Sequence, residues 1–245
     1  MQTIYKPRFA AGEYADYALN IYTGCPHRCW YCFVPKRRVR KINGTGVYGK
    51  EAFHADVKPR EADGKDIIRA AREYVSSTKM TGKTIHLCFT CDPYPTGCDC
   101  SATREIIKIL KDAGNHVQIL TKGDGTGDFD LLNENDWYGI SLDGTTDMPH
   151  QRGTALRIDD LRKAHEKGIR TWVSFEPVVY PAGALQQIRE TAPFADKVKI
   201  GKLNYFDEFE KNIDWKAFGK AAEALCRELG VEYYIKEGLR FEMNR

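Results

Sequence analysis

Short apolar runs, rich in β-branched and aromatic residues, alternate along this chain with longer segments of helical spacing. The short runs predict strands at residues 19–22, 85–89, 116–120, 137–142, 171–175, 198–200 and 232–235. The longer segments carry apolar residues three or four positions apart and predict helices at residues 66–76, 101–113, 158–167, 184–190 and 215–229. Gly114, Gly168 and Gly230 follow three of these segments, where glycine commonly ends a helix.

This alternation indicates an α/β fold with a parallel sheet, arranged as an open sheet or as a full or partial barrel. In either arrangement the chemistry lies at the carboxyl ends of the strands and in the loops that follow them. The 245 residues contain no linker, repeat or low-complexity tract, so we expect one domain spanning residues 1–245.

Composition narrows the class of protein further. Hydrophobic residues make up 42% and charged residues 29%, which is typical of a globular chain, and the net charge of +3 is too small to indicate nucleic-acid binding by itself. The N-terminus lacks a signal sequence, and no apolar run is long enough to span a bilayer, so we expect a cytoplasmic protein without a membrane partner. The eight cysteines are then expected to serve metals or catalysis.

Three cysteines stand within eight residues directly after the first predicted strand, with the spacing Cys25-x3-Cys29-x2-Cys32. Thiolates are the ligands that iron–sulfur clusters need, and so tight a loop can bind three irons of a cubane. The fourth iron is then open to a small molecule. The alternative is a zinc site, which needs a fourth ligand such as His27 or a distant cysteine and usually has two separated ligand pairs.

The segment NIYTGCPHRCWYCFVP, followed later by FTCDPYP and ILTK, resembles the radical S-adenosylmethionine (SAM) superfamily. Within it the chain looks like the spore photoproduct lyase and DNA repair photolyase-like group, from about residue 20 to about residue 181. The resemblance implies a partial (β/α)6 TIM-type barrel and a [4Fe–4S] cluster on Cys25, Cys29 and Cys32. It also implies reductive cleavage of SAM to methionine and a 5′-deoxyadenosyl radical, with an electron donor of the flavodoxin or ferredoxin type.

The same resemblance assigns cofactor contacts to the ends of the next strands. Thr90, Asp92 and Tyr94 lie where the family contacts the amino end of SAM, and Thr90 and Asp92 are acceptors of the kind an ammonium group needs. Lys122 is expected to pair with the SAM carboxylate and Ser141 with its ribose. Each position has a plainer interpretation: a proline-containing turn capped by Asp92, a surface lysine, and an Asp-Gly turn after Ser141.

Glu176 ends the fifth predicted strand and is followed by a proline. A carboxylate held there suits recognition of the substrate or the ribose, and it equally suits an ion pair with one of the many lysines.

A second group of cysteines has the pattern CxxC-x6-CxC, formed by Cys88, Cys91, Cys98 and Cys100. These thiols are interpreted either as ligands of a second metal or cluster, or as a source of hydrogen atoms. In the second interpretation Cys88 or Cys91 is catalytic and donates a hydrogen atom to a substrate radical, which resembles the role of a strand cysteine in spore photoproduct lyase. Alignment with that family's TSD sequence places Phe89 where its donor cysteine would stand, so the chain departs from the pattern there.

A basic run follows the three-cysteine loop and consists of Lys36, Arg37, Arg38, Arg40 and Lys41. It is interpreted either as a phosphate-binding segment beside stacking aromatics (Trp30, Tyr31 and Tyr48) or as a solvated charge run. The sequence therefore leaves three functions open: a radical SAM enzyme acting on DNA or RNA, a radical SAM enzyme acting on a peptide or small molecule, and a non-enzymatic zinc or iron–sulfur module.

Overall fold

The computed structural model describes residues 2–35 and 50–245. Its central feature is a parallel sheet in which each strand pairs with the next one in the order β1-β6-β7-β8-β9-β10-β11. These strands are β1 (Tyr17–Leu19), β6 (Thr84–Leu87), β7 (His116–Thr121), β8 (Trp137–Leu142), β9 (Arg170–Val178), β10 (Lys197–Lys202) and β11 (Glu232–Ile235). Two short antiparallel pairs follow β1, namely β2 (Tyr22–Thr23) with β3 (Lys58–Pro59) and β4 (Glu61–Ala62) with β5 (Lys65–Asp66).

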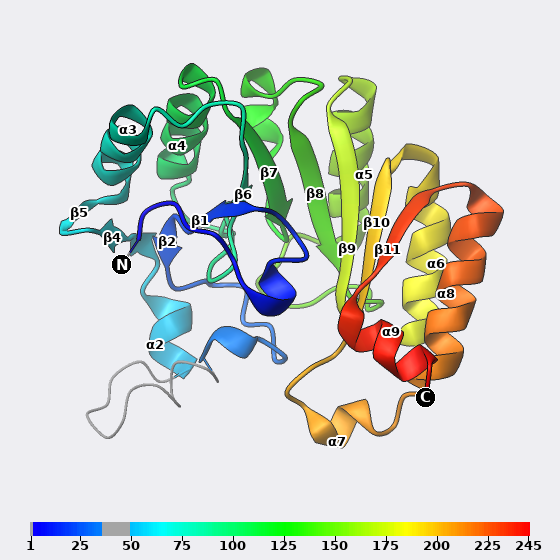
Figure 1. The fold of residues 1–245 in the computed structure, drawn as a ribbon. Coiled ribbons are helices and arrows are strands. Elements are labelled where there is room, and N and C mark those ends of the chain that lie inside the picture. Colours follow the sequence, from blue (N-terminus) through cyan, green and yellow to red (C-terminus); the bar gives the residue numbers. More distant parts are fainter. Residues whose placement is uncertain (1, 36–49) are drawn as a thin grey trace.

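Helices cover one face of this sheet, as Figure 1 shows for α3 to α6 and α8. They are α3 (Ile67–Thr78), α4 (Ser101–Asp112), α5 (Thr154–Glu166), α6 (Pro181–Thr191) and α8 (Trp215–Leu229). The shorter α2 (Lys50–Ala55), α7 (Asp207–Glu210) and α9 (Glu237–Met243) lie at the edge where the strands end (Figure 1). Single 3-10 turns form η1 (Phe9–Ala11), η2 (Thr126–Leu131) and η3 (Ala192–Phe194).

The sheet is a partial barrel, as expected, with one strand more than a (β/α)6 arrangement. In the described part of the chain β1 and β11 stand at opposite edges of the sheet and do not pair. The connection between β7 and β8 contains η2 in place of a full helix, and α9 was not expected from the sequence. None of the described helices is both long enough and apolar enough to cross a membrane.

The first strand ends earlier than the sequence predicts. β1 stops at Leu19, and the chain then turns away to pair β2 with β3. The side chain of Asn20 explains the break, because its Oδ1 accepts the backbone N–H groups of Phe89 at 2.7 Å and Thr90 at 2.8 Å. A side chain that bonds to the neighbouring loop in this way competes with continuation of the strand.

The two faces of the sheet differ in chemistry. The helix-covered face contributes buried aliphatic side chains to one continuous core, whose burial supplies most of the folding free energy. On the concave face Trp172 donates from Nε1 to the carbonyl of Ile119 at 2.9 Å. Gly139 on β8 makes room for that indole, since a Cβ there would lie 2.2 Å from Trp172 Nε1.

The N-terminal segment crosses the open side of this barrel in front of the sheet (Figure 1). Lys199 donates from Nζ to the carbonyls of Glu13 at 2.8 Å and Tyr14 at 3.2 Å, and Lys236 donates to the carbonyl of Ala10 at 3.0 Å. Bonds from β10 and from the end of β11 therefore hold residues 10–14 across the gap that a closed barrel would fill with strands.

Candidate functional site

The three-cysteine loop is clamped against the segment that ends α2. Cys25 donates its N–H to the carbonyl of Phe53 at 2.9 Å, and His54 Nδ1 donates to the carbonyl of Cys25 at 2.7 Å. Gly24 makes this approach possible, because it has φ of +80° and a Cβ there would stand 2.4 Å from the carbonyl oxygen of Asp56. The loop conformation thus depends on a glycine directly before the first cysteine.

All eight cysteines are free thiols, and the three in the loop are half-buried. Burial raises the pKa values of Cys25 and Cys29. Across residues 2–35 and 50–245, no three His, Cys, Asp or Glu side chains converge on one point that could hold a single metal ion. A cubane cluster does not need such convergence, because each thiolate binds a different iron. The donor set therefore fits a cluster better than a single zinc ion.

His27, the fourth ligand that a zinc site would use, is engaged elsewhere. Its Nε2 accepts the N–H of Thr96 at 3.1 Å, so its proton lies on Nδ1, which faces Asp92 Oδ2 at 3.4 Å. Both ring nitrogens of this buried residue have protein partners, which argues against the zinc interpretation.

Asp92 ties the cysteine loop to the ends of β6 and β7. Besides His27, its buried carboxylate accepts Tyr94 N–H at 2.9 Å, Thr121 O–H at 2.5 Å and Lys122 N–H at 2.8 Å. Burial acts to raise its pKa, but the electrostatic attraction and hydrogen bond of His27, together with the hydrogen bonds from Thr121 and Lys122, outweigh burial and lower it. The ionised carboxylate is satisfied by protein donors.

The side chain of Lys122 lies at the end of β7 and points toward the end of β8. Its Nζ donates to Ser141 Oγ at 2.8 Å and lies 3.9 Å from Asp143 Oδ2, and the Tyr31 hydroxyl donates to the same carboxylate. Burial lowers the pKa of Lys122, although Asp143 opposes that shift, and Lys122 in turn acts on Cys29 by lowering its pKa against the larger effect of burial. A buried cation therefore faces the cysteine loop.

Thr90 and Tyr94 occupy different surroundings from Lys122. Thr90 is held by its backbone N–H on Asn20, and its half-buried hydroxyl has no hydrogen-bond partner among the described residues. The Tyr94 hydroxyl instead donates to Asp128 Oδ2 at 3.0 Å, on the side of η2. Tyr94 is connected to the other expected cofactor contacts by its backbone N–H, which donates to the Asp92 carboxylate.

The second group of cysteines divides into two pairs. Burial and the neighbouring Cys91 thiol raise the pKa of Cys88, and Cys91 Sγ accepts the N–H of Tyr22 at 3.3 Å. Cys98 and Cys100 instead donate to nearby carbonyls of their own loop. No three of these four thiols meet as a single-ion site.

Glu176 lies within a separate network on the concave face. Its Oε2 accepts the Tyr14 hydroxyl and Lys236 Nζ, each at 2.5 Å, and the same hydroxyl is 2.9 Å from Ser174 Oγ. The interpretation of Glu176 as the partner of a lysine is therefore confirmed, and the tyrosine is an addition that no local pattern predicted.

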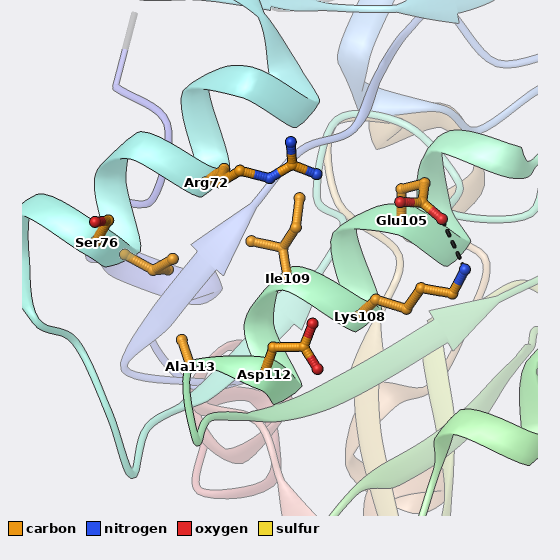
Figure 2. A pocket seen from close by; sticks show the side chains of 8 residues that line it. Arg72, Ser76, Glu105, Lys108, Ile109, Asp112 and Ala113 are labelled. Carbon is orange, nitrogen blue, oxygen red and sulfur yellow. Dashed lines mark hydrogen bonds and ion pairs between the residues drawn. The ribbon is translucent and has the colours of Figure 1, made fainter.

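Two cavities of the described structure border α4. A groove of about 330 Å³ between α3 and α4 is lined by Arg72, Ile109 and the Glu105–Lys108 pair. Lys108 Nζ lies 2.8 Å from Glu105 Oε1, and Figure 2 marks this pair by a dashed line. None of the expected site residues lines the groove. A second cavity of about 290 Å³ lies beside Tyr94 and Cys100 at the start of α4.

An aromatic cluster borders the cysteine loop on the other side. The Trp30 ring lies 5.3 Å from the ring of Phe206 and 4.5 Å from that of Phe209, which is half-exposed on α7. The expected basic run, Lys36 to Lys41, and Tyr48 fall outside the described residues.

Several residues of this edge were missed by sequence reasoning. Asn20 and Tyr31 bind the loops after β6 and β8, and Gln151 donates to Cys29 Sγ. Arg157 of α5 is buried and donates to the carbonyl of Ser141. Asn20 lay inside the strand predicted at residues 19–22, Tyr31 was expected only as a stacking aromatic, and no sequence signal pointed to Gln151 or Arg157.

The sequence matches the family described as the Radical SAM superfamily over residues 19–195. It is 27% identical over 236 residues to the uncharacterized protein MJ0683 of Methanocaldococcus jannaschii, covering 91% of this chain and 84% of that protein.

Among solved structures, a point mutant of spore photoproduct lyase has a TM-score of 0.65 at 13% identity, over 94% of this chain and 78% of that one. Spore photoproduct lyase complexed with dinucleoside spore photoproduct has a TM-score of 0.63 at 13% identity, over the same shares of 94% and 78%. SuiB of Streptococcus suis bound to its precursor peptide SuiA has a TM-score of 0.63 at 11% identity, over 93% of this chain and 50% of SuiB. These likenesses show a shared fold, and the family match spans well over half of the sequence: this chain belongs to the radical SAM superfamily.

Proposed function

We propose that residues 1–245 form one radical SAM domain that cleaves SAM reductively at a [4Fe–4S] cluster held by Cys25, Cys29 and Cys32. Members of this superfamily are enzymes that use SAM and an iron–sulfur cluster and need a reductant. The observation that carries the proposal is the clamped three-cysteine loop, which presents three free thiols at the carboxyl edge of the sheet opposite a buried lysine. A flavodoxin or ferredoxin in a reducing cytoplasm is the electron donor that we propose.

When bound, the cluster supplies the electron that splits SAM into methionine and a 5′-deoxyadenosyl radical. The chain's own residues then have distinct tasks. Lys122 places a buried cation where the SAM carboxylate binds, and Ser141 keeps that ammonium aimed through its 2.8 Å hydrogen bond. The hydroxyl of Thr90, which has no hydrogen-bond partner among the described residues, accepts a hydrogen bond from the SAM amino group. Tyr94 in the same loop is proposed as a further contact to SAM.

Asp92 acts as a positioning residue in this proposal. Its carboxylate already receives donors from His27, Thr121 and the main chain of Lys122. Because these donors already occupy the carboxylate, its proposed role is to orient the three loops around the cofactor and not to bind the SAM ammonium group.

The proposed substrate is a nucleic acid. The support is the structural likeness to spore photoproduct lyase, which has been solved with a dinucleoside spore photoproduct. Glu176, with its Tyr14 and Lys236 partners, is the substrate-side group on the concave face, and Cys88 or Cys91 is the proposed hydrogen donor. A peptide substrate is the second candidate, supported by the likeness to SuiB bound to SuiA.

Anaerobic reconstitution followed by SAM cleavage tests the cluster proposal. Wild-type protein should take up about four irons per chain and release 5′-deoxyadenosine under dithionite. Cys25→Ala, Cys29→Ala and Cys32→Ala should each abolish release, because each removes one of three ligands, while Cys98→Ala in a half-exposed loop serves as the matched control. Continued release from a triple cysteine variant would rule out this cluster site.

Oligonucleotide binding at several salt concentrations tests the substrate class. If phosphates are contacted, affinity should fall linearly on a logarithmic salt scale, by about 0.7 to 0.9 log units per contact. Arg37→Ala, Arg38→Ala and Arg40→Ala together should flatten that slope and leave SAM cleavage without substrate intact. Wild-type affinity that does not depend on salt would favour the peptide instead.

A further inference from the structure

Gln151 reaches from the loop after β8 to a cysteine of the proposed cluster site. Its Nε2 donates to Cys29 Sγ at 3.2 Å, and the same nitrogen lies 3.5 Å from Met148 Sδ. Its Oε1 is buried and has no hydrogen-bond partner among the described residues. The hydrogen bond to Cys29 Sγ therefore orients the amide, because the amide oxygen accepts no hydrogen bond from the described residues.

The neighbouring residue fixes this position. Arg152 donates its N–H to the carbonyl of Lys122 at 3.1 Å, and its guanidinium binds Asp160 at 2.5 Å and Asp124 at 2.7 Å. These bonds connect the loop after β8 to β7 and α5, and they lie directly next to Gln151 in the chain. The amide is thus held in place by the fold and does not depend on Cys29 for its location.

We infer that Gln151 is a positioning residue that sets the reduction potential of the cluster through an N–H···S hydrogen bond to Cys29. The inference rests on the proposed function, because it requires Cys29 to be a cluster ligand. The bond uses a lone pair of the sulfur that iron coordination leaves available, so it is compatible with a bound cluster.

The direction of the effect follows from charge. Reduction adds negative charge to the cluster and its thiolates, and an N–H donor stabilises the more negative state more strongly. Gln151 therefore favours the reduced cluster.

Potentiometric titration of the reconstituted protein tests this inference without any activity measurement. Gln151→Met keeps the length of the side chain and removes the donor, and Gln151→Glu keeps its shape and replaces the amide by a carboxylate. We expect Gln151→Met to lower the ratio of reduced to oxidised cluster at a fixed potential about tenfold, which is about 59 mV for one electron. Gln151→Glu should lower it further, because it also brings a negative charge to the sulfur.

Gln186→Met on the exposed face of α6 is the matched control and should leave the potential unchanged. Circular dichroism identifies a variant that fails to fold, and iron content identifies one that fails to take up the cluster. If one of the two Gln151 variants fails in this way, the potential of the other tests the inference. Wild-type potentials in loaded Gln151→Met or Gln151→Glu would overturn the inference and leave the proposed function standing. A wild-type protein that binds no cluster would end both.

Discussion

The carboxylate of Asp92 offers a direct test of how the site is built, because it joins three loops in one buried place. Asp92→Ala removes the acceptor for the N–H groups of Tyr94 and Lys122, the hydroxyl of Thr121 and the ring of His27. Those donors remain buried in the variant. Asp92→Asn keeps the shape of the side chain but turns an NH2 group toward some of the same donors.

The expected loss in the free energy of unfolding depends on how many buried donors lose their acceptor. Each buried donor left without a partner costs about 1–3 kcal/mol, but these costs do not add fully because water enters and loops relax. With four such donors and partial relaxation, we expect a total loss of about 3–5 kcal/mol. For a chain of this size that loss lowers the melting temperature by roughly 10 °C, and Asp92→Asn should lose less because one oxygen remains an acceptor.

The pH dependence provides an independent check. The pKa of Asp92 in the folded protein lies below its usual value, since the electrostatic attraction of His27 and the hydrogen bonds outweigh the effect of burial. The unfolded carboxyl has a pKa of about 3.9. Its contribution to stability is therefore complete above that pH and is lost as pH falls through the folded pKa. The gap between wild type and Asp92→Ala should be constant near neutrality and narrow below about pH 4.

Thermal and urea unfolding of the apoproteins at pH 7 and at pH 3.5 measure these effects. Asp159→Ala, which removes an exposed carboxylate from α5, is the control and should change the melting temperature little. A melting temperature of Asp92→Ala within a degree or two of wild type would mean that the four donors do not need this carboxylate, and it would refute the reasoning about Asp92.

Three further predictions concern other parts of the chain. Gly24→Ala should reduce iron uptake on reconstitution at least severalfold, because its Cβ would stand 2.4 Å from the Asp56 carbonyl at a φ of +80°; iron analysis checks it. Gly139→Ala should lower stability by about 1–3 kcal/mol through overpacking against Trp172, measured by urea unfolding. Burial lowers the pKa of Lys199 to about 8, so the unfolded chain binds more protons above that pH, and stability from this group should rise between about pH 8 and 10; Lys199→Met should abolish that rise.

The sequence predicted the elements whose pattern is local. Strands rich in β-branched residues and helices with apolar stripes were located, and Gly114, Gly168 and Gly230 do adopt the positive φ that ends a helix. The start of α4 at Ser101 also agrees with the predicted range, and Asp99 accepts the N–H of Ser101 at 2.8 Å.

No local sequence pattern predicted which polar side chains are buried. The helix predicted at residues 158–167 left out Arg157, which is buried in α5, and α5 begins at Thr154. Gln151 lies in a loop with no periodicity, and its contact with Cys29 joins residues 122 positions apart. Such pairs follow from which strands become neighbours, and that information is held by the whole fold.

The polar side chains at the strand ends form a series of ties that runs along the sheet. Asn20 after β1 accepts from the loop after β6, Asp92 in that loop accepts from the end of β7, and Lys122 after β7 donates to Ser141 at the end of β8.

A second set of ties joins the other half of the sheet. There Glu176 on β9 binds Lys236 after β11 and the N-terminal Tyr14. Backbone carbonyls link this set to the first: Gln118 of β7 donates to the carbonyl of Tyr14 at 3.2 Å, and the N–H of Val179 donates to the carbonyl of Asp143 at 2.8 Å. The carboxyl edge thus has two sets of side-chain ties that are joined through the main chain. The half that holds the cysteine loop is preorganised by bonds between adjacent strands, so a change at one strand end alters the next. The other half shares its anchors with the N-terminal segment, and a substrate bound there would meet groups whose positions are set by residues 10–14. If the proposed function holds, a substitution in the second half alters contacts to the substrate and leaves the proposed cofactor contacts of the first half in place.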